Sequence, residues 1–164
     1  MMKPLDSGVI TGGVHHFPLR VYYEDTDAGG IVYYARYLYF AERARSEFLR
    51  ALDTDGHDMH GLMAQESCAF VVRRVTATYH QPARLHDALV MVTRVCQLGR
   101  ASLVMEQNLY RQDTPLFTSE VRLACVSIGD RGGRAGKVVA IPHALWQAMV
   151  AMVHKEGQKE KVIT

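Results

Sequence analysis

Residues 22–37 read YYEDTDAGGIVYYARY and combine three carboxylates (Glu24, Asp25 and Asp27), two adjacent glycines and a run of tyrosines. One aspartate and one glycine are enough for an ordinary turn. This stretch carries more polar groups than a turn requires, and it stands between a strand predicted at 17–24 and the start of a helical pattern. We therefore predict a strand-to-helix junction that does more than reverse the chain.

A long amphipathic helix is predicted to follow this junction, from about residue 32 to residue 52. Apolar and small side chains recur there at spacings of three and four, as they do along one face of a helix. This face consists of Tyr37, Ala41, Ala44, Phe48 and Leu52. Because two members are alanines, the helix can lie close to a sheet.

The segment GHDMHG at 56–61 ends the helical pattern and contains His57 and His60. A zinc site requires three or four ligands that converge on the metal. Two glycines bound this short segment, so we predict a loop whose histidines face a pocket or solvent, and no metal site.

The apolar pattern changes to a period of two after residue 68, which indicates strands. The alternating segments are 68–80, 87–97, 101–112 and 116–128. Four consecutive strands with short connections predict an antiparallel meander. A second helix is predicted at 143–157, directly after Pro142. One long helix and one antiparallel sheet can bury their apolar faces only against each other, so the predicted fold class is α+β.

The chain has 164 residues, of which 48% are hydrophobic and 22% are charged, as in a globular protein with one domain. We predict a flexible leader at 1–16, a single domain at 17–153 and a charged tail at 154–164. A formal net charge of +2 is too small to favour a nucleic-acid partner. The sequence shows no signal peptide and no apolar run that could span a bilayer, and its three cysteines are scattered. We therefore expect reduced thiols and a cytoplasmic location.

The junction has the parts that acyl transfer requires. The start of a helix offers backbone N–H groups without partners, which attract a developing oxyanion. Gly29 and Gly30 allow a sharp turn and the close approach of a ligand. A nearby carboxylate can attack a carbonyl or activate water. The alternative is that these aspartates only cap the turn; we favour a cap for Asp25, and the residues alone leave both roles open for Asp27.

Residues 25–37, DTDAGGIVYYARY, resemble the signature of the hotdog-fold thioesterases of the 4-hydroxybenzoyl-CoA thioesterase family. The likeness is greatest to the acyl-CoA thioesterases encoded with the bacterial Tol–Pal envelope system. It continues in FAERARSEFLR (40–50), AFVVRR (69–74) and HQPARLHD (80–87). It implies the hotdog fold, in which a twisted antiparallel sheet wraps a long central helix, here with an additional C-terminal helix.

The resemblance also implies an activity, the hydrolysis of an acyl-CoA to a free acid and CoA without a metal or organic cofactor. Asp27 would be the nucleophile or general base, and the backbone N–H of Tyr34, in the first turn of the helix, would donate to the thioester oxygen. Gly30, Val32 and Tyr33 would contact the substrate. The Tol–Pal-associated enzymes usually have histidine at the position of Tyr34, a departure that leaves the backbone donor intact.

Further expectations concern CoA binding and assembly. Arg131 and Arg134 lie in the glycine-rich loop GDRGGRAGK at 129–137. They either bind the phosphates of CoA or belong to a solvated hairpin. The resemblance implies a homodimer, or a tetramer formed by two dimers, with each active site at a subunit interface.

Several alternatives remain open at this point. Glu42 and Glu47 on the long helix are other candidate carboxylates, although arginines three and four residues away predict a solvated face. The chain could instead be a non-catalytic module that binds acyl-CoA or an acyl carrier protein, or a hotdog dehydratase. A dehydratase would need a histidine and an acid on the helix, and Tyr33 and Tyr34 at its start argue against that reading.

Overall fold

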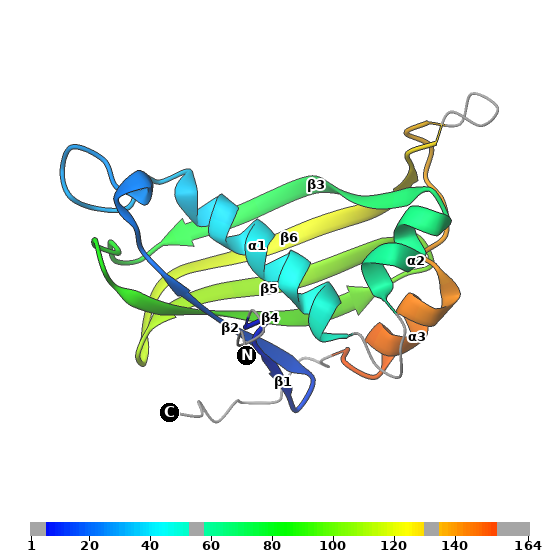
Figure 1. Ribbon diagram of the computed structural model, residues 1–164, viewed down its shortest axis with the longest axis horizontal. Helices are drawn as coiled ribbons and strands as arrows, with labels where there is room; N and C mark the ends of the chain where they lie inside the picture. Colours follow the sequence, from blue (N-terminus) through cyan, green and yellow to red (C-terminus); the bar gives the residue numbers. More distant parts are fainter. Residues whose placement is uncertain (1–5, 53–57, 130–134, 154–164) are drawn as a thin grey trace, which may run out of the picture.

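A computed structural model describes residues 6–52, 58–129 and 135–153, in which one long helix lies across a six-stranded antiparallel sheet (Figure 1). The strands are β1 (Val9–Thr11), β2 (Val14–Arg20), β3 (Cys68–Tyr79), β4 (Ala88–Leu98), β5 (Ser102–Arg111) and β6 (Thr114–Ser127). The helices are the 3-10 turn η1 (Tyr23–Asp25), α1 (Arg36–Ala51), α2 (Met59–Gln65) and α3 (His143–Val150). No helix within these ranges is both long enough and apolar enough to cross a lipid bilayer.

The strand order is β1-β2-β4-β5-β6-β3, so the predicted meander of four consecutive strands is wrong at its first member. Strands β4 to β6 form a meander, whereas β3 pairs with β6 and lies at an edge of the sheet. The segment between β3 and β4 bonds to the junction instead of forming a tight turn, because the Val32 N–H donates to the Ala83 carbonyl at 2.9 Å. Alternation in a sequence indicates a strand but does not identify its neighbour.

The predicted leader is also partly wrong, because residues 9–11 and 14–16 belong to strands. Gly12 and Gly13 have φ values of +58° and +79°, and they form the two-residue turn of a hairpin between β1 and β2. His15, which lies within the predicted leader, is fully buried. Residues 1–5 and the predicted tail at 154–164 lie outside the described residues.

The helices differ from their predicted bounds for local reasons. Helix α1 begins at Arg36 rather than near residue 32, because the backbone of the preceding residues bonds to neighbouring segments. Helix α3 ends at Val150, seven residues before the predicted end. Helix α2 replaces the last part of the predicted loop; Met59 and Met63, one turn apart, are both buried, and His57 lies outside the described residues.

The predicted apolar face of α1 is confirmed. Tyr37, Ala41, Ala44, Phe48 and Leu52 are all buried. The first three pack in a cluster with side chains of β4 and β6, and the last two pack in a second cluster with α2 and α3. The helix is therefore fixed along its whole length, and the junction before it is held in one place.

Candidate active site

Asp25 ties the junction to the rest of the fold. Its side chain is buried; one carboxylate oxygen accepts from the Tyr22 N–H at 2.8 Å and the other from Arg36 Nε at 3.0 Å. Its backbone carbonyl accepts from the Tyr33 N–H at 2.9 Å. Asp25 thus joins the end of β2 to the start of α1, which is the structural role that the sequence favoured for it.

Asp27 begins a tight turn directly after this anchor. Its N–H donates to the Ile31 carbonyl at 2.9 Å, and the Gly30 N–H donates back to the Asp27 carbonyl at 3.0 Å. Gly30 has a φ of +74°, a conformation that a residue with a side chain rarely adopts. The side chain is exposed, and its Oδ1 accepts from the Gly29 N–H at 2.8 Å. Within the described chain Oδ2 accepts no hydrogen bond. One carboxylate oxygen therefore stabilises the turn, and the other is available to contact a ligand.

A cavity of about 430 Å³ opens beside this turn, within the usual size range of ligand pockets. One wall comes from the junction and the other from the segment that follows β3. The lining residues are Asp27, Ile31, Val32, Tyr33, Tyr34, Tyr37, Tyr79, His80, Gln81 and Pro82. The structure therefore brings Asp27, Val32, Tyr33 and Tyr34 together, whereas Gly30 shapes the turn without lining the cavity.

Tyr34 lies two residues before α1, not in its first turn as expected. Its carbonyl accepts a hydrogen bond from the Tyr79 hydroxyl at 2.9 Å. Its N–H donates to no backbone carbonyl among the described residues, and the next turn is closed by the Arg36 N–H, which donates to the Tyr33 carbonyl at 2.8 Å. A hydrogen bond with the Tyr34 phenol raises the pKa of the Tyr33 phenol above its ordinary value. Asp27 and Tyr34, whose N–H has no backbone partner among the described residues, therefore line the same cavity.

Three aromatic rings make the base of the cavity rigid. Tyr37 stacks on Phe117, and Tyr79 meets Tyr37 edge-on, each with ring centres 5.3 Å apart. The Tyr37 hydroxyl accepts from the Ala83 N–H at 3.0 Å, and burial raises the pKa of this phenol. Sequence reasoning missed Tyr79, although its position at the end of a strand, just before a proline-containing break, is a usable signal.

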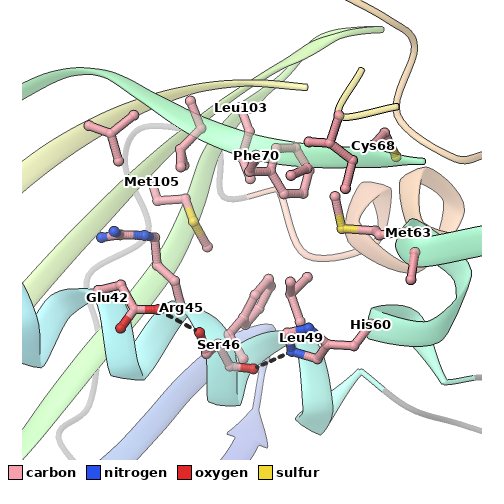
Figure 2. A pocket seen from close by; sticks show the side chains of 16 residues that line it. Glu42, Arg45, Ser46, Leu49, His60, Met63, Cys68, Phe70, Leu103 and Met105 are labelled. Atoms are coloured by element: carbon pink, nitrogen blue, oxygen red, sulfur yellow. Dashed lines mark hydrogen bonds between the residues drawn. The ribbon is translucent and has the colours of Figure 1, made fainter. Parts of the chain in front are cut away.

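The other candidate residues lie elsewhere. Glu47 is bound to Arg50, with 2.6 Å between Oε1 and Nη1. Glu42 accepts from the Ser46 hydroxyl at 2.8 Å and lines a separate cavity of about 340 Å³ between α1, α2 and β3 (Figure 2). Neither carboxylate lines the Asp27 cavity of its own chain. The predicted phosphate-binding residues Arg131 and Arg134 lie outside the described residues.

A buried polar group under α1 was also missed. Gln107 on β5 is fully buried and donates to the Ala41 carbonyl at 2.9 Å. Its oxygen accepts from Arg45 Nη1 at 2.8 Å, and burial lowers the pKa of Arg45. These hydrogen bonds provide partners for a polar side chain that faces the helix, because successive residues of β5 point to opposite faces of the sheet.

Comparisons with known proteins agree on one family. The model of the thioesterase-like superfamily matches residues 21–149. The acyl-CoA thioesterase YbgC of Haemophilus influenzae is 45% identical over 113 residues, which are 69% of this chain and 81% of that protein. The acyl-CoA thioesterase YbgC of Helicobacter pylori is 40% identical over 117 residues, or 66% and 83% of the two chains.

Solved structures give the same result. A probable thioesterase from Bartonella henselae is 36% identical, with a TM-score of 0.65 over 79% of this chain and 98% of that one. A 4-hydroxybenzoyl CoA thioesterase shares the fold at 13% identity, with a TM-score of 0.72 over 83% of this chain and 98% of that one. These likenesses confirm the predicted α+β hotdog fold.

Proposed function

This chain belongs to the thioesterase-like superfamily, and from this premise we propose that it is an acyl-CoA thioesterase with Asp27 as its catalytic carboxylate. The relatives named acyl-CoA thioesterases support the reaction and the substrate class. The observation that carries the assignment is the geometry of the junction, where the Asp27 carboxylate and the uncommitted Tyr34 N–H belong to one cavity.

The reaction follows from these two groups. A carboxylate oxygen of Asp27 adds to the thioester carbon, and the carbonyl oxygen becomes an oxyanion that accepts a hydrogen bond from the Tyr34 N–H. One such donor contributes about 3–4 kcal/mol to the stability of the transition state. The oxyanion collapses, the carbon–sulfur bond breaks, and CoA leaves as a thiolate that takes a proton from water. Water then cleaves the mixed anhydride, which releases the free acid and restores Asp27.

A second route uses the same groups. Asp27 takes a proton from a water molecule, whose oxygen attacks the thioester carbon directly. Both routes give a free acid and CoA, and both require the charged carboxylate. In either route Val32 and Tyr33 contact the substrate from the cavity wall, and Gly30 keeps the turn open to it. Arg131 and Arg134 remain candidates for the phosphates of CoA.

We also propose a homodimer, or a tetramer made of two dimers, in which two β3 strands pair edge to edge. Residues 71–79 of β3 are exposed, and they include Val71, Val72 and Val75. A long exposed strand edge of this kind is normally covered by another strand or another element. An acyl carrier protein is the alternative carrier of the acyl group. Free cysteines at 68, 96 and 125 support a reducing, cytoplasmic setting.

The test is the release of free thiol from a panel of aliphatic and aromatic acyl-CoAs by wild type and by Asp27→Asn. Asparagine keeps the oxygen that accepts from the Gly29 N–H but lacks the charge. We expect a loss of kcat of about a hundredfold or more, the scale of a lost acid–base group. Asp113→Asn, at another exposed turn, is the matched control and should retain full turnover. Negligible release by wild type, with acyl-CoA still bound, would instead identify a binding module.

A further inference from the structure

Hydrolysis of a thioester requires a proton for the departing sulfur. The charged Asp27 carboxylate attacks the thioester carbon and has no proton to give. The Tyr34 N–H stabilises the oxyanion but, as an amide, does not release its proton. A side chain that first donates a proton and later recovers it would serve both halves of the reaction.

Several side chains that exchange protons line the Asp27 cavity. They are His80 and the phenols of Tyr33, Tyr34, Tyr37 and Tyr79. His80 is engaged with β6, because its Nε2 bonds to the Thr118 hydroxyl at 2.9 Å. Tyr37 is buried and its hydroxyl is bonded to the backbone, and the Tyr79 hydroxyl donates to the Tyr34 carbonyl. The two phenols of the junction itself therefore remain as proton donors.

Tyr33 and Tyr34 form a pair of phenols at the open side of the cavity. Their ring centres are 4.8 Å apart, and a hydrogen bond joins the two side chains. Tyr33 is 47% exposed and Tyr34 is 64% exposed, whereas Tyr37 at the base is 3% exposed. CoA is a large charged group that stays in contact with solvent, so its sulfur departs on the side where this pair lies.

The hydrogen bond between the two phenols has a direction. It raises the pKa of the Tyr33 phenol, which is the effect expected when the Tyr33 O–H donates, because donation favours the neutral form. The Tyr34 oxygen is then the acceptor, and its own O–H is directed elsewhere. Within the part of the chain that the structure describes, this O–H donates to no protein group. Its proton is therefore available to a ligand.

The Tyr34 phenol lies close to the place of reaction. Burial raises the pKa of the Tyr79 phenol, and the Tyr37 and Tyr34 phenols raise it further, because all three share one space. The Tyr34 N–H is the proposed donor to the thioester oxygen, and the sulfur is only two bonds from that oxygen. A thioester held at this N–H therefore has its sulfur within reach of the phenol of the same residue.

We propose that the Tyr34 phenol is a second catalytic group, which relays a proton from water to the sulfur of the departing CoA. Tyr33 is a positioning residue, because its hydrogen bond turns the Tyr34 O–H toward the substrate. This inference rests on the proposed function and adds the proton donor of the same site.

The relay has two steps. As the carbon–sulfur bond breaks, the sulfur keeps the bonding electrons and takes the phenol proton, which leaves CoA as a thiol and Tyr34 as a phenolate. The phenolate then takes a proton from the water that cleaves the mixed anhydride, and the free acid and the Asp27 carboxylate are released. In the route through general-base catalysis, the phenolate recovers its proton from Asp27 instead. Either way Tyr34 ends as it began.

The first test removes only the phenol oxygen. Tyr34→Phe keeps the ring and the backbone N–H, and the single-turnover rate of thiol release should fall at least about tenfold with the acyl-CoA that wild type hydrolyses fastest. Tyr39→Phe is the matched control, because Tyr39 of α1 is 56% exposed but does not line the Asp27 cavity. It should keep the wild-type rate, and thermal melts check that both variants fold. A wild-type rate in Tyr34→Phe overturns the proposal.

The second test changes the leaving group. Thiophenol is a much stronger acid than an alkyl thiol, so its thiolate departs without a proton donor. With the S-phenyl thioester of the same acyl group, Tyr34→Phe should release thiol within about twofold of the wild-type rate. Tyr33→Phe should lose about fivefold with the CoA thioester only, as expected for one lost hydrogen bond. Equal losses with both thioesters would indicate a merely structural effect and overturn the relay.

The third test replaces the phenol with another proton donor. An imidazole exchanges protons near neutral pH, so Tyr34→His should recover at least about a third of the wild-type rate with the CoA thioester. Tyr34→Gln is polar but exchanges no proton, and it should stay as slow as Tyr34→Phe. Equal rates in the histidine and glutamine variants contradict the relay.

Failure of the proposed function gives a different pattern. Asp27→Asn would then retain turnover, whatever the behaviour of Tyr34. An inactive Asp27→Asn beside a fully active Tyr34→Phe overturns the phenol relay alone.

Discussion

Asp25 and Asp27 are two residues apart, yet their surroundings assign them different roles. Asp25 is buried and accepts hydrogen bonds from Tyr22 and Arg36. Asp27 is exposed, and only one of its carboxylate oxygens is used by the turn. The motif predicted that one aspartate is structural and that the other is a candidate catalyst. The partners that fix this distinction come from both sides of the junction, and spacing does not reveal them.

Tyr79 is the residue whose contribution to the site can be tested most directly. Its hydroxyl donates to the Tyr34 carbonyl, and we expect Tyr79→Phe to loosen the turn that presents the Tyr34 N–H. Loss of one hydrogen bond of about 1 kcal/mol predicts a decrease in kcat of about fivefold, with KM little changed. The ring contacts with Tyr37 and Phe117 remain, so stability should change little.

Steady-state kinetics on one acyl-CoA, with a thermal melt of each protein, checks this prediction. Tyr110→Phe on β5 is the matched control and should behave as wild type. A Tyr79→Phe enzyme with unaltered kcat would show that the turn before α1 is held by other contacts.

At the scale of elements, the sequence correctly predicted the features that depend on the spacing of apolar residues within one segment. The buried face of α1 and all four long strands follow from spacings within each segment. The place of β3 at the sheet edge could not be predicted, because it depends on bonds between the segment at 80–87 and the junction. The hairpin at β1 and β2 could have been found, since Gly12-Gly13 between two β-branched stretches is a hairpin signal.

This hairpin predicts a pH dependence of stability. His15 bonds to the Ser7 carbonyl at 2.7 Å through Nε2 and packs edge-on against Phe48, while its buried Nδ1 has no hydrogen-bond partner among the described residues. Burial lowers the pKa of His15 below 6.5 in the folded protein, opposed by the Ser7 bond and by Glu47. His16 has its pKa lowered by burial and by Arg94.

The direction of the pH effect on stability follows from the linkage between proton binding and folding. Below pH 6.5 the unfolded chain binds more protons at these histidines than the folded chain does. Stability is therefore complete above that value and is lost as the pH falls toward the folded pKa values. Urea unfolding at about pH 7.5 and about pH 5.5 should show this loss. His15→Gln should reduce it, leaving the part that belongs to His16; an identical pH slope in this variant contradicts the assignment.

At the scale of the whole molecule, the exposed edge of β3 is the surface through which we propose that two copies pair. Val75→Asp places a carboxylate on each of two copies at this edge. Two buried and unpaired charges should weaken the dimer at least about a hundredfold. Sedimentation and light scattering measure the effect, and turnover of acyl-CoA should fall with the dimer population.

Val150→Asp on α3 is the control, because Val150 is similarly exposed but lies away from β3. It should leave the assembly unchanged. If Val75→Asp stays dimeric at micromolar concentration, the copies associate through another surface, and the proposed pairing of two β3 edges is wrong.

The sheet order also affects how the nascent chain folds. The ribosome completes β3 before any of β6, its neighbour in the sheet that the structure describes, has been synthesised. Until then the strand has no ladder to join, while α1 and the hairpin have already emerged. Contacts between segments so distant in sequence form slowly. Tyr79 therefore reaches its position in the wall of the Asp27 cavity late, after the ribosome has synthesised β6.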